Sequence, residues 1–592
     1  MKNLFSITLL ILVFNTPSWA SENKESLINW QEWSAESFAK AKKENKLVIM
    51  DLEAVWCHWC HVMDAKTYHD PNVAALINKH FVPIRVDQDA HPDISNRYED
   101  YGWPATVIFD ADGEEIVKRR GYIGPKFMGW FLEAVIAEPT AEAHDNKKAI
   151  VVTGNTTFLN KEQKELLKKR YEFVYDQNNK GWGRRQKFIH SDSIEYAITQ
   201  ATMGSKTHEK MAKDTLDAAR ALIDPVWGGV YQYSDEADWK SPHFEKIMLI
   251  QTDSLRLYAM AYNLWGRQRD LDSAMQIYHY LNTMLKSPEG VFYTSQDADL
   301  NEKVDGHAFF PLNDKERRKL GIPRIDKNIY ARENGWVISA LLTLYSATGE
   351  DKYLNEGIAT ADWIIKNRSI EGGGFLHKKD NKDSLFLADT LAMGRAFLDL
   401  YAATANRDWL DKAENASAFI AKYFEDPNGG FSTRAVANKN LLLTPVKHLN
   451  SQILTARFGN LLNHYSGKKE HRKLAEHAMR YLSSPDLTNQ HRLLAGVLLS
   501  NMEISQDPVH ITIVGDKNSH TAKQLFTAGI TYPAEYKRVE WWDKSEGDLP
   551  NPNVTYPQLA KPAAFACANN ACSSPIYETK NIAEVVNALM KF

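Results

Sequence analysis

Two cysteines and a histidine in the segment VWCHWCHVM are the residues of this sequence best suited to chemistry. Cys57 and Cys60 form a Cys-x-x-Cys pair, and His61 follows directly. Such a pair is typical of a redox dithiol, but Cys-x-x-Cys-His also attaches c-type haem, and two cysteines can supply half of a zinc site. Met63 lies too near to be the second haem ligand, and no further ligands follow at zinc-site spacing. The dithiol is therefore the favoured interpretation.

The elements that flank the pair support this interpretation. Residues 47–55, LVIMDLEAV, are apolar and predict a strand, whereas residues 61–68, HVMDAKTY, predict a helix. Cys57 then lies at a helix N-terminus, where unpaired N–H groups and the helix dipole stabilise a thiolate. A protonated His58 would act in the same direction. We expect Cys57 to attack a disulfide and Cys60, one turn further, to resolve the mixed disulfide.

Two more features near the pair could take part in the chemistry. Asp51 lies in the middle of the apolar strand, where its carboxylate is either a buried proton acceptor near Cys60 or faces outward at the strand end. Trp103-Pro104 precedes the strand ATVIF, and a proline is allowed at a strand start. A cis peptide there would bring backbone beside the sulfur atoms.

The segments DLEAVWCHWC and GWPATVIF together resemble a thioredoxin fold. The resemblance implies that Cys57 is the attacking thiol, Cys60 the resolving thiol, Asp51 the buried acid and Pro104 the cis-proline. It also implies a set of neighbours that support the redox site: Trp56, His58, Trp59 and Trp103.

A chain of 592 residues is expected to form roughly three or more domains. Helix and strand patterns alternate in the N-terminal part, helical periodicity dominates the centre, and strands return near the end. The predicted division is a signal peptide at 1–20, a thioredoxin-like α/β domain at 21–140, a linker at 141–157, a helical domain at 158–506 and a small α/β tail at 507–592.

The helical part contains a recurring unit. A tyrosine is followed nine residues later by a leucine in Tyr262/Leu271, Tyr345/Leu354, Tyr401/Leu410 and Tyr465/Leu474. In each unit an apolar helix meets a short polar turn and a second amphipathic helix, and glycine-aromatic loops such as VWGGVYQYS separate the units. This pattern indicates an (α/α) toroid rather than a strict solenoid. An irregular helical bundle with glycine C-caps is the alternative.

Several motifs along the chain resemble one family. The segments CHWCHVM, RVDQDAHPDI, GWP, GGVYQYS, PHFEK, YTSQDAD and AAFACANNAC are similar to those of the spermatogenesis-associated, thioredoxin-like family. This resemblance covers nearly the whole mature chain. It implies a thioredoxin-like domain fused to a helical ring like that of the six-hairpin glycosidases.

Acidic residues and a histidine follow the glycine-aromatic loops of the predicted ring. They are His243, Glu245, Asp253, Asp297 and Asp299. Carboxylates beside Trp and Tyr at a toroid mouth suit sugar chemistry, whereas an epimerase would favour histidines as acid and base. The same residues can instead cap helices or form structural ion pairs. The ring can therefore be a catalytic site, or a cleft that binds or holds a client.

The second cysteine pair, Cys567 and Cys572, flanks ANNA near the end of the chain. The five-residue step allows a local disulfide if the loop turns tightly. Alternatively, the pair relays electrons to or from Cys57 and Cys60. We assign no metal ligands and no cofactor.

The net charge limits the kinds of partner, and the N-terminal pattern indicates the compartment. With 71 basic and 75 acidic residues the net charge is −4, which argues against a general nucleic-acid binder. Residues 1–20 have the layout of a cleaved secretory signal, and the apolar run of eleven residues is shorter than the about 20 that span a bilayer. We expect an exported, periplasmic protein without a stable membrane anchor after signal cleavage.

Two hypotheses for function follow. The first is a thiol-disulfide oxidoreductase that acts on protein thiols or disulfides, or with a redox partner protein, and whose ring binds the client. The second is a carbohydrate-active or carbohydrate-binding ring, belonging to carbohydrate metabolism, with an accessory thioredoxin domain.

Overall fold

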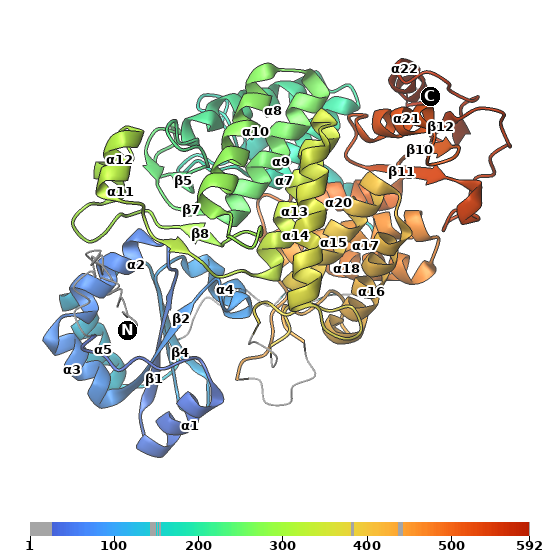
Figure 1. The fold of residues 1–592 in the computed structure, drawn as a ribbon. Coiled ribbons are helices and arrows are strands. Elements are labelled where there is room, and N and C mark those ends of the chain that lie inside the picture. Colours follow the sequence, from blue (N-terminus) through green and yellow to red (C-terminus); the bar gives the residue numbers. More distant parts are fainter. Residues whose placement is uncertain are drawn as a thin grey trace, which may run out of the picture.

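The computed structural model describes residues 26–142, 150, 152, 156–379, 384–435 and 442–590. The predicted signal peptide at 1–20 lies outside the described residues, as does most of the predicted linker. An N-terminal α/β domain, a large helical ring and a C-terminal α/β domain follow one another along the chain (Figure 1). In the part of the chain that is described, no helix is long and apolar enough to cross a membrane.

The N-terminal domain is built on a four-stranded sheet with the order β2-β1-β3-β4. Strand β1 pairs in parallel with β2, whereas β3 pairs antiparallel with both β1 and β4. The strands are β1 (Leu47–Glu53), β2 (Phe81–Asp87), β3 (Ala105–Phe109) and β4 (Glu115–Arg120). This strand order is that of the predicted thioredoxin fold.

Helices cover both faces of this sheet because alternate strand residues are apolar on each side. One apolar cluster joins α1 (Ala35–Glu44) and α4 (Pro92–Tyr98) to one face. The other joins α2 (His58–Met63), α3 (Pro71–His80) and α5 (Pro125–Ala137) to the opposite face. The helix that carries the cysteines thus rests on a fully packed sheet.

The helical part closes into a ring of inner helices. Each inner helix contacts the next, and the last contacts the first. In order they are α7 (Ser191–Thr202), α9 (Met248–Trp265), α13 (Ala331–Thr348), α15 (Leu387–Thr404), α17 (Leu449–Ser466) and α20 (Ala495–Ser505). The closed ring confirms the toroid and excludes the irregular bundle.

An outer helix packs on each of these inner helices. The outer helices, in the same order, are α8 (Lys206–Ala219), α10 (Gln268–Tyr280), α14 (Asp351–Arg368), α16 (Arg407–Phe424), α18 (Lys469–Leu482) and α6 (Lys161–Val174). Helix α6 precedes α7 in sequence yet packs on α20, the last inner helix. The start and the end of the helical region therefore pack against each other.

The tyrosine-leucine repeat marks the inner-to-outer turns. Tyr262 and Tyr345 lie near the C-termini of inner helices, and their carbonyls accept the N–H of Gly266 and Gly349. Both glycines adopt left-handed backbone (φ +63° and +70°), which ends the helix and starts the turn. The leucine nine residues after each tyrosine then lies in the first turns of the outer helix.

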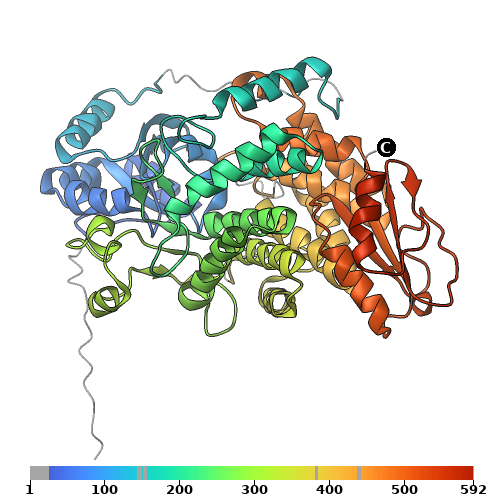
Figure 2. The same cartoon turned by 90° about the horizontal axis from the view of Figure 1, so that it is seen from above.

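The C-terminal domain contains a second four-stranded sheet, ordered β11-β10-β12-β13. It comprises β10 (Val509–Val514), α21 (His520–Ile530), β11 (Lys537–Trp542), β12 (Ala563–Ala568), β13 (Ala571–Cys572) and α22 (Lys580–Leu589). Strand β10 pairs in parallel with β11 and antiparallel with β12, so this sheet repeats the order and pairing of the N-terminal one. The two α/β domains lie at opposite ends of the ring (Figures 1 and 2).

The similarity between the two α/β domains extends to the helix N-cap after the first strand and to the proline before the third strand. Ser519 is the N-cap of α21 and accepts the N–H of Ala522, as Cys57 caps α2 and accepts the N–H of Cys60. Pro562 directly precedes β12, as Pro104 precedes β3. The C-terminal domain thus has a thioredoxin-like core in which serine and alanine stand where the dithiol would be.

Candidate functional site

Cys57 and Cys60 are joined in a disulfide at the start of α2. Cys57 is the N-cap residue, and its sulfur accepts the backbone N–H of Cys60 at 3.1 Å. The helix continues past Met63 as a π-helical turn, Asp64–Tyr68, so the predicted helix after the pair is present. This places the Cys57 sulfur at the free N–H groups of a helix, where a thiolate is stabilised.

An apolar cluster surrounds the disulfide. The peptide bond between Trp103 and Pro104 is cis, and Trp103 packs edge-to-face with Trp56 at 5.6 Å between ring centroids. Ile247, from the ring, packs against the same cluster. Each cysteine is only 3% exposed. The N-terminal domain and the ring therefore bury the dithiol together.

Asp51 is buried, at 2% exposure, and does not face outward. It lies on the same face of β1 as Ile49, which packs under α2 and α3. Its Oδ2 is 3.4 Å from Arg85 Nε, and its Oδ1 has no hydrogen-bond partner among the described residues. Burial raises the pKa of Asp51 to about 6 although Arg85 opposes the shift. A carboxyl that titrates there can accept or return a proton at neutral pH.

Replacing this acid by its neutral isostere, Asp51→Asn, is expected to stabilise the N-terminal domain at pH 8 by about 1–3 kcal/mol. The folded-state pKa is raised, so the cost of burying the charge is absent below the ordinary value of 3.8 and is complete once the pH passes about 6. Calorimetry of the full chain at pH 5 and pH 8 measures the difference.

The exposed Asp112, whose side chain is 69% accessible, provides the matched control as Asp112→Asn. That variant should change stability little at either pH. An Asp51→Asn chain that is no more stable than the parent at pH 8 would show that Arg85 already compensates the charge.

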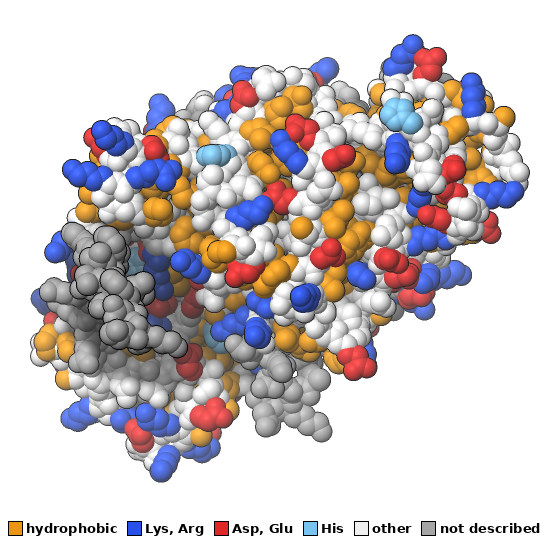
Figure 3. Space-filling view, viewed as in Figure 1, with side chains coloured by type: hydrophobic (Ala, Val, Ile, Leu, Met, Phe, Trp, Pro, Cys, Tyr) orange, Lys and Arg blue, Asp and Glu red, His pale blue; other side chains and the backbone are white. Residues whose placement is uncertain are grey.

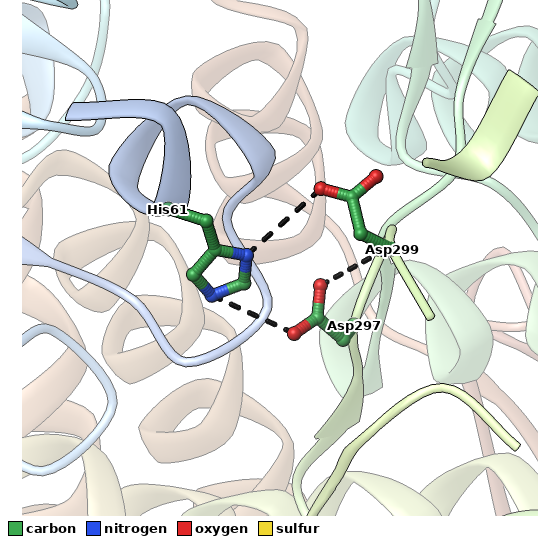
Figure 4. A group of neighbouring side chains, drawn as sticks. All are labelled: His61, Asp297 and Asp299. Atoms are coloured by element: carbon green, nitrogen blue, oxygen red, sulfur yellow. Dashed lines mark hydrogen bonds and ion pairs between the residues drawn. The ribbon is translucent and has the colours of Figure 1, made fainter. Parts of the chain in front are cut away.

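The ring contacts the cysteine helix through two acidic residues that follow β8 (Ser295–Gln296) (Figure 4). His58 Nδ1 lies 2.6 Å from Asp299 Oδ2. His61 lies between the two carboxylates, with Nε2 at 3.5 Å from Asp297 Oδ2 and Nδ1 at 3.9 Å from Asp299 Oδ2. We call His58, His61, Asp297 and Asp299 the interdomain latch. It lies one turn from the disulfide that the two domains bury.

Electrostatics favours the charged forms of most of the latch. The hydrogen bond with Asp299 raises the pKa of His58. Burial works against His61, but its contacts with Asp299 and Asp297 raise its pKa to about 9. The two histidines in turn hold the pKa of Asp299 below its usual range, against burial. The contact between the domains is therefore ionic at neutral pH.

A backbone hydrogen bond adds to the latch. The N–H of Ala298, between the two aspartates, donates to the carbonyl of Trp56 at 3.3 Å. Trp56 directly precedes the reactive cysteine. The segment of the ring from Asp297 to Asp299 thus lies along the backbone that leads into the dithiol.

The predicted toroid residues separate into two groups. Glu245 is buried beside His243, with 3.9 Å between Oε2 and Nδ1, and its charge acts on Asp297. Asp253 does not join them. It lies on α9, and its electrostatic partners are Arg256 and Glu195 inside the ring.

The interior of the ring is filled by ion pairs between inner helices. Glu195 of α7 pairs with Arg256 of α9 at 2.6 Å and with Arg457 of α17, which also pairs with Glu503 of α20 at 2.8 Å. Burial raises the pKa of Asp253 in this network, and Arg256 opposes the shift. Asp253 therefore belongs to the support of the ring rather than to its mouth.

A cleft of about 230 Å³ lies between the ring and the N-terminal domain, and sequence reasoning missed it. Its walls include Trp56 and Trp103 from the N-terminal domain and Arg332, Glu333 and Trp336 from α13. Glu333 is buried, and its Oε2 has no hydrogen-bond partner among the described residues. None of the five predicted toroid residues lines this cleft. The sequence feature that could have indicated this cleft is ARENGW, residues 331–336, which places charged and aromatic side chains at the start of an apolar helix.

The remaining sequence-predicted residues have distinct places. Trp59 is 43% exposed and leans against Tyr122 at 5.8 Å between ring centroids, so it is the solvent-facing aromatic residue of the motif. Cys567 and Cys572 form a disulfide between β12 and β13. Asn569 and Asn570, with φ of +49° and +61°, make the tight turn between these strands. This pair closes a hairpin at the far end of the ring from Cys57.

Comparisons with known proteins agree with this arrangement. A family model described as a protein of unknown function, DUF255 (Thioredox_DsbH), matches residues 11–160, and a model of Glycosyl Hydrolase Family 88 matches residues 334–441. An uncharacterized protein of Caenorhabditis elegans is 23% identical over 95% of both chains. Spermatogenesis-associated protein 20 of Rattus norvegicus is 26% identical over 46% of this chain and 39% of its own length.

Among solved structures, a cellobiose 2-epimerase from Bacillus thermoamylovorans matches 54% of this chain and 85% of its own, with 13% identity and a TM-score of 0.43. The family matches confirm the resemblance drawn from the motifs, a thioredoxin-like domain together with a region similar to a glycoside hydrolase. The closed ring and the N-terminal sheet confirm the predicted fold class.

Proposed function

We propose that this chain is a thiol-disulfide oxidoreductase whose dithiol, Cys57 and Cys60, reacts when the ring moves away from it. One observation supports the proposal above the others. The sulfur of Cys57 caps a helix and accepts the N–H of Cys60, which is the environment that stabilises an attacking thiolate. The cis-proline before β3 and the buried carboxyl of Asp51 also support a thioredoxin-like site.

The proposed reaction is a pair of thiol-disulfide exchanges. In the reduced chain the Cys57 thiolate attacks a client disulfide, forms a mixed disulfide and releases one client thiolate. The Cys60 thiolate then attacks the Cys57 sulfur, restores the bond between the two cysteines and releases the second client thiolate. Asp51, with a pKa of about 6, accepts the proton that Cys60 loses, directly or through water. The same steps in reverse oxidise a client dithiol.

Access limits this reaction in the closed arrangement. Both cysteines are 3% exposed, and a protein disulfide needs more room than that to approach Cys57 in line. Asp297, Asp299 and Ile247 come from the ring, so a movement of the ring exposes the dithiol beside the already exposed Trp59. We propose that the clients are protein thiols and disulfides or a redox partner protein.

The compartment is part of the proposal. The secretory-signal pattern at residues 1–20 and two cysteine pairs, both disulfide-bonded, suit an exported protein in an oxidising periplasm. Charged side chains of both signs are interspersed over the face in Figure 3, without the single-sign patch that a nucleic acid would require. The carbohydrate hypothesis stays a prediction. The tryptophan-lined cleft suits it better than the five residues named for it.

A redox titration of the full chain tests the proposal. The oxidised protein is equilibrated in dithiothreitol buffers of graded potential, its thiols are alkylated, and peptides with Cys57 and Cys60 are quantified by mass spectrometry. We expect a two-electron transition whose midpoint moves by less than about 30 mV in the variant Cys567→Ser/Cys572→Ser. A larger shift would revive the electron relay, and a pair that never exchanges would refute the proposed function.

A further inference from the structure

We propose that His61, Asp297 and Asp299 hold a divalent transition-metal ion, zinc or one of similar ligand preference, between the N-terminal domain and the ring. The inference goes beyond the proposed redox function and does not depend on it, because no cysteine takes part. One nitrogen and one carboxylate oxygen from each residue lie within 4.8 Å of one another.

The distances from His61 to the two aspartates are longer than those of a direct hydrogen bond. His61 Nε2 lies 3.5 Å from Asp297 Oδ2 and His61 Nδ1 lies 3.9 Å from Asp299 Oδ2, both longer than an N–H···O hydrogen bond of about 2.7–3.2 Å. Two ligands of a single ion are separated by about 3–4 Å when each bond is about 2.0–2.2 Å long. Figure 4 shows both carboxylates on the same side of the imidazole, one toward each ring nitrogen, and one ligand atom from each of the three residues lies within 4.8 Å of the others.

The side chains are already fixed for this role. The backbone N–H of Asp299 donates to Asp297 Oδ1, and the N–H of Gly306 donates to Asp299 Oδ1, each at 2.9 Å. Each aspartate thus keeps its Oδ2 on the side of the imidazole, and His58 Nδ1 also holds Asp299 Oδ2 at 2.6 Å. The Val55 carbonyl lies 3.2 Å from His61 Nε2. When Nε2–H donates to it, Nδ1, which lies 3.9 Å from Asp299 Oδ2, is left as the ligand, and a metal-binding histidine is commonly held by such a carbonyl.

A third buried carboxylate lies beside this group. Glu245 is 3% exposed, and its Oε2 has no hydrogen-bond partner among the described residues. Its charge acts on both Asp297 and His58. Three carboxylates, Asp297, Asp299 and Glu245, therefore lie close to His58, His61 and His243. A divalent ion would add positive charge beside these carboxylates, and Glu245 is placed to act on it from outside the ligand set.

The ligand types indicate which ion fits. One imidazole and two carboxylates, with positions left for water, suit zinc and its neighbours in the first transition row. Magnesium and calcium prefer oxygen-only sites, and calcium needs six to eight ligands. The bound ion would join two segments about 240 positions apart and hold the domains together.

Isothermal titration of the untagged, oxidised full chain with zinc chloride tests the inference. We expect one ion per chain with a dissociation constant of 10 μM or lower, and no saturable heat with 1 mM magnesium chloride. The change Asp297→Asn should weaken zinc binding at least tenfold, and so should His61→Gln. The exposed Glu302, in the same loop as the aspartates, gives the control Glu302→Gln, which should bind zinc like the parent.

Two further measurements keep the result decisive if a variant folds poorly. The variant Cys57→Ser/Cys60→Ser should retain zinc binding, and bound cobalt should show a ligand-field spectrum without a thiolate-to-metal band. Absence of saturable zinc binding in the parent would overturn the inference. So would a zinc affinity that Asp297→Asn leaves unchanged in a folded chain, or one that disappears with the cysteines.

Discussion

The substitution Cys57→Ser is expected to slow thiol-disulfide exchange by roughly a thousandfold or more, whereas Cys60→Ser is expected to trap a mixed disulfide. A serine hydroxyl does not ionise at neutral pH and cannot replace the thiolate that caps α2. The Cys60→Ser chain keeps that thiolate but has no second thiol to release the client. Reaction of the reduced chain with a chromogenic aryl disulfide gives the rate, and intact-mass analysis gives the adduct.

The chain offers its own control for this experiment. Cys567→Ser/Cys572→Ser removes the other disulfide, which lies across the ring, and should leave the exchange rate unchanged. An adduct trapped by Cys57→Ser instead of Cys60→Ser would reverse the two roles. If neither variant forms an adduct under conditions that open the ring, the dithiol is not an exchange centre.

Loosening the latch is expected to have the second large effect. Asp299→Asn should speed the reduction of the Cys57–Cys60 disulfide by roughly tenfold or more. The hydrogen bond between His58 and Asp299 is short, at 2.6 Å, and charge-assisted. Such bonds contribute about 1.5–3 kcal/mol, and 1.4 kcal/mol changes an equilibrium tenfold. A larger open population then exposes the disulfide more often.

The measurement uses a water-soluble phosphine as reductant, in EDTA so that no metal contributes, followed by alkylation at timed intervals. Glu302→Gln removes a carboxylate from the same loop without touching the latch and should react like the parent chain. Equal rates for Asp299→Asn and the parent would mean that small reductants reach the disulfide without any movement of the ring.

Sequence patterns were sufficient for the features that depend on near neighbours. The apolar strand before the cysteines and the helix after them follow from residue periodicity, and together they place Cys57 at the helix N-cap. Asp51 is buried because it lies two residues after Ile49 in β1, on the same covered face of the strand. The repeated tyrosine marked the inner-helix ends because Tyr262, Tyr345 and Tyr401 each lie four positions before the left-handed residue that ends the helix.

The packing of one domain on another was beyond these patterns. Asp299 contacts His58 across 241 positions, and no periodicity relates the two segments. The acidic residues of SQDAD were expected at an open mouth, yet they are directed to the N-terminal domain because its cysteine helix covers that end of the ring. Asp253 lies only eight residues after Glu245, but it lies on an inner helix, where the charge of Arg256 acts on it. Proximity in sequence was therefore misleading for this group.

The C-terminal domain has the same strand order as the N-terminal domain but no cysteines at the N-terminus of its first helix. Ser519 and Ala522 stand at the N-terminus of α21 as Cys57 and Cys60 stand at that of α2, and both caps accept the same third N–H of their helix. The same N-cap hydrogen bond is thus made by a sulfur in one domain and by a hydroxyl in the other, so the local helix geometry does not require the cysteines.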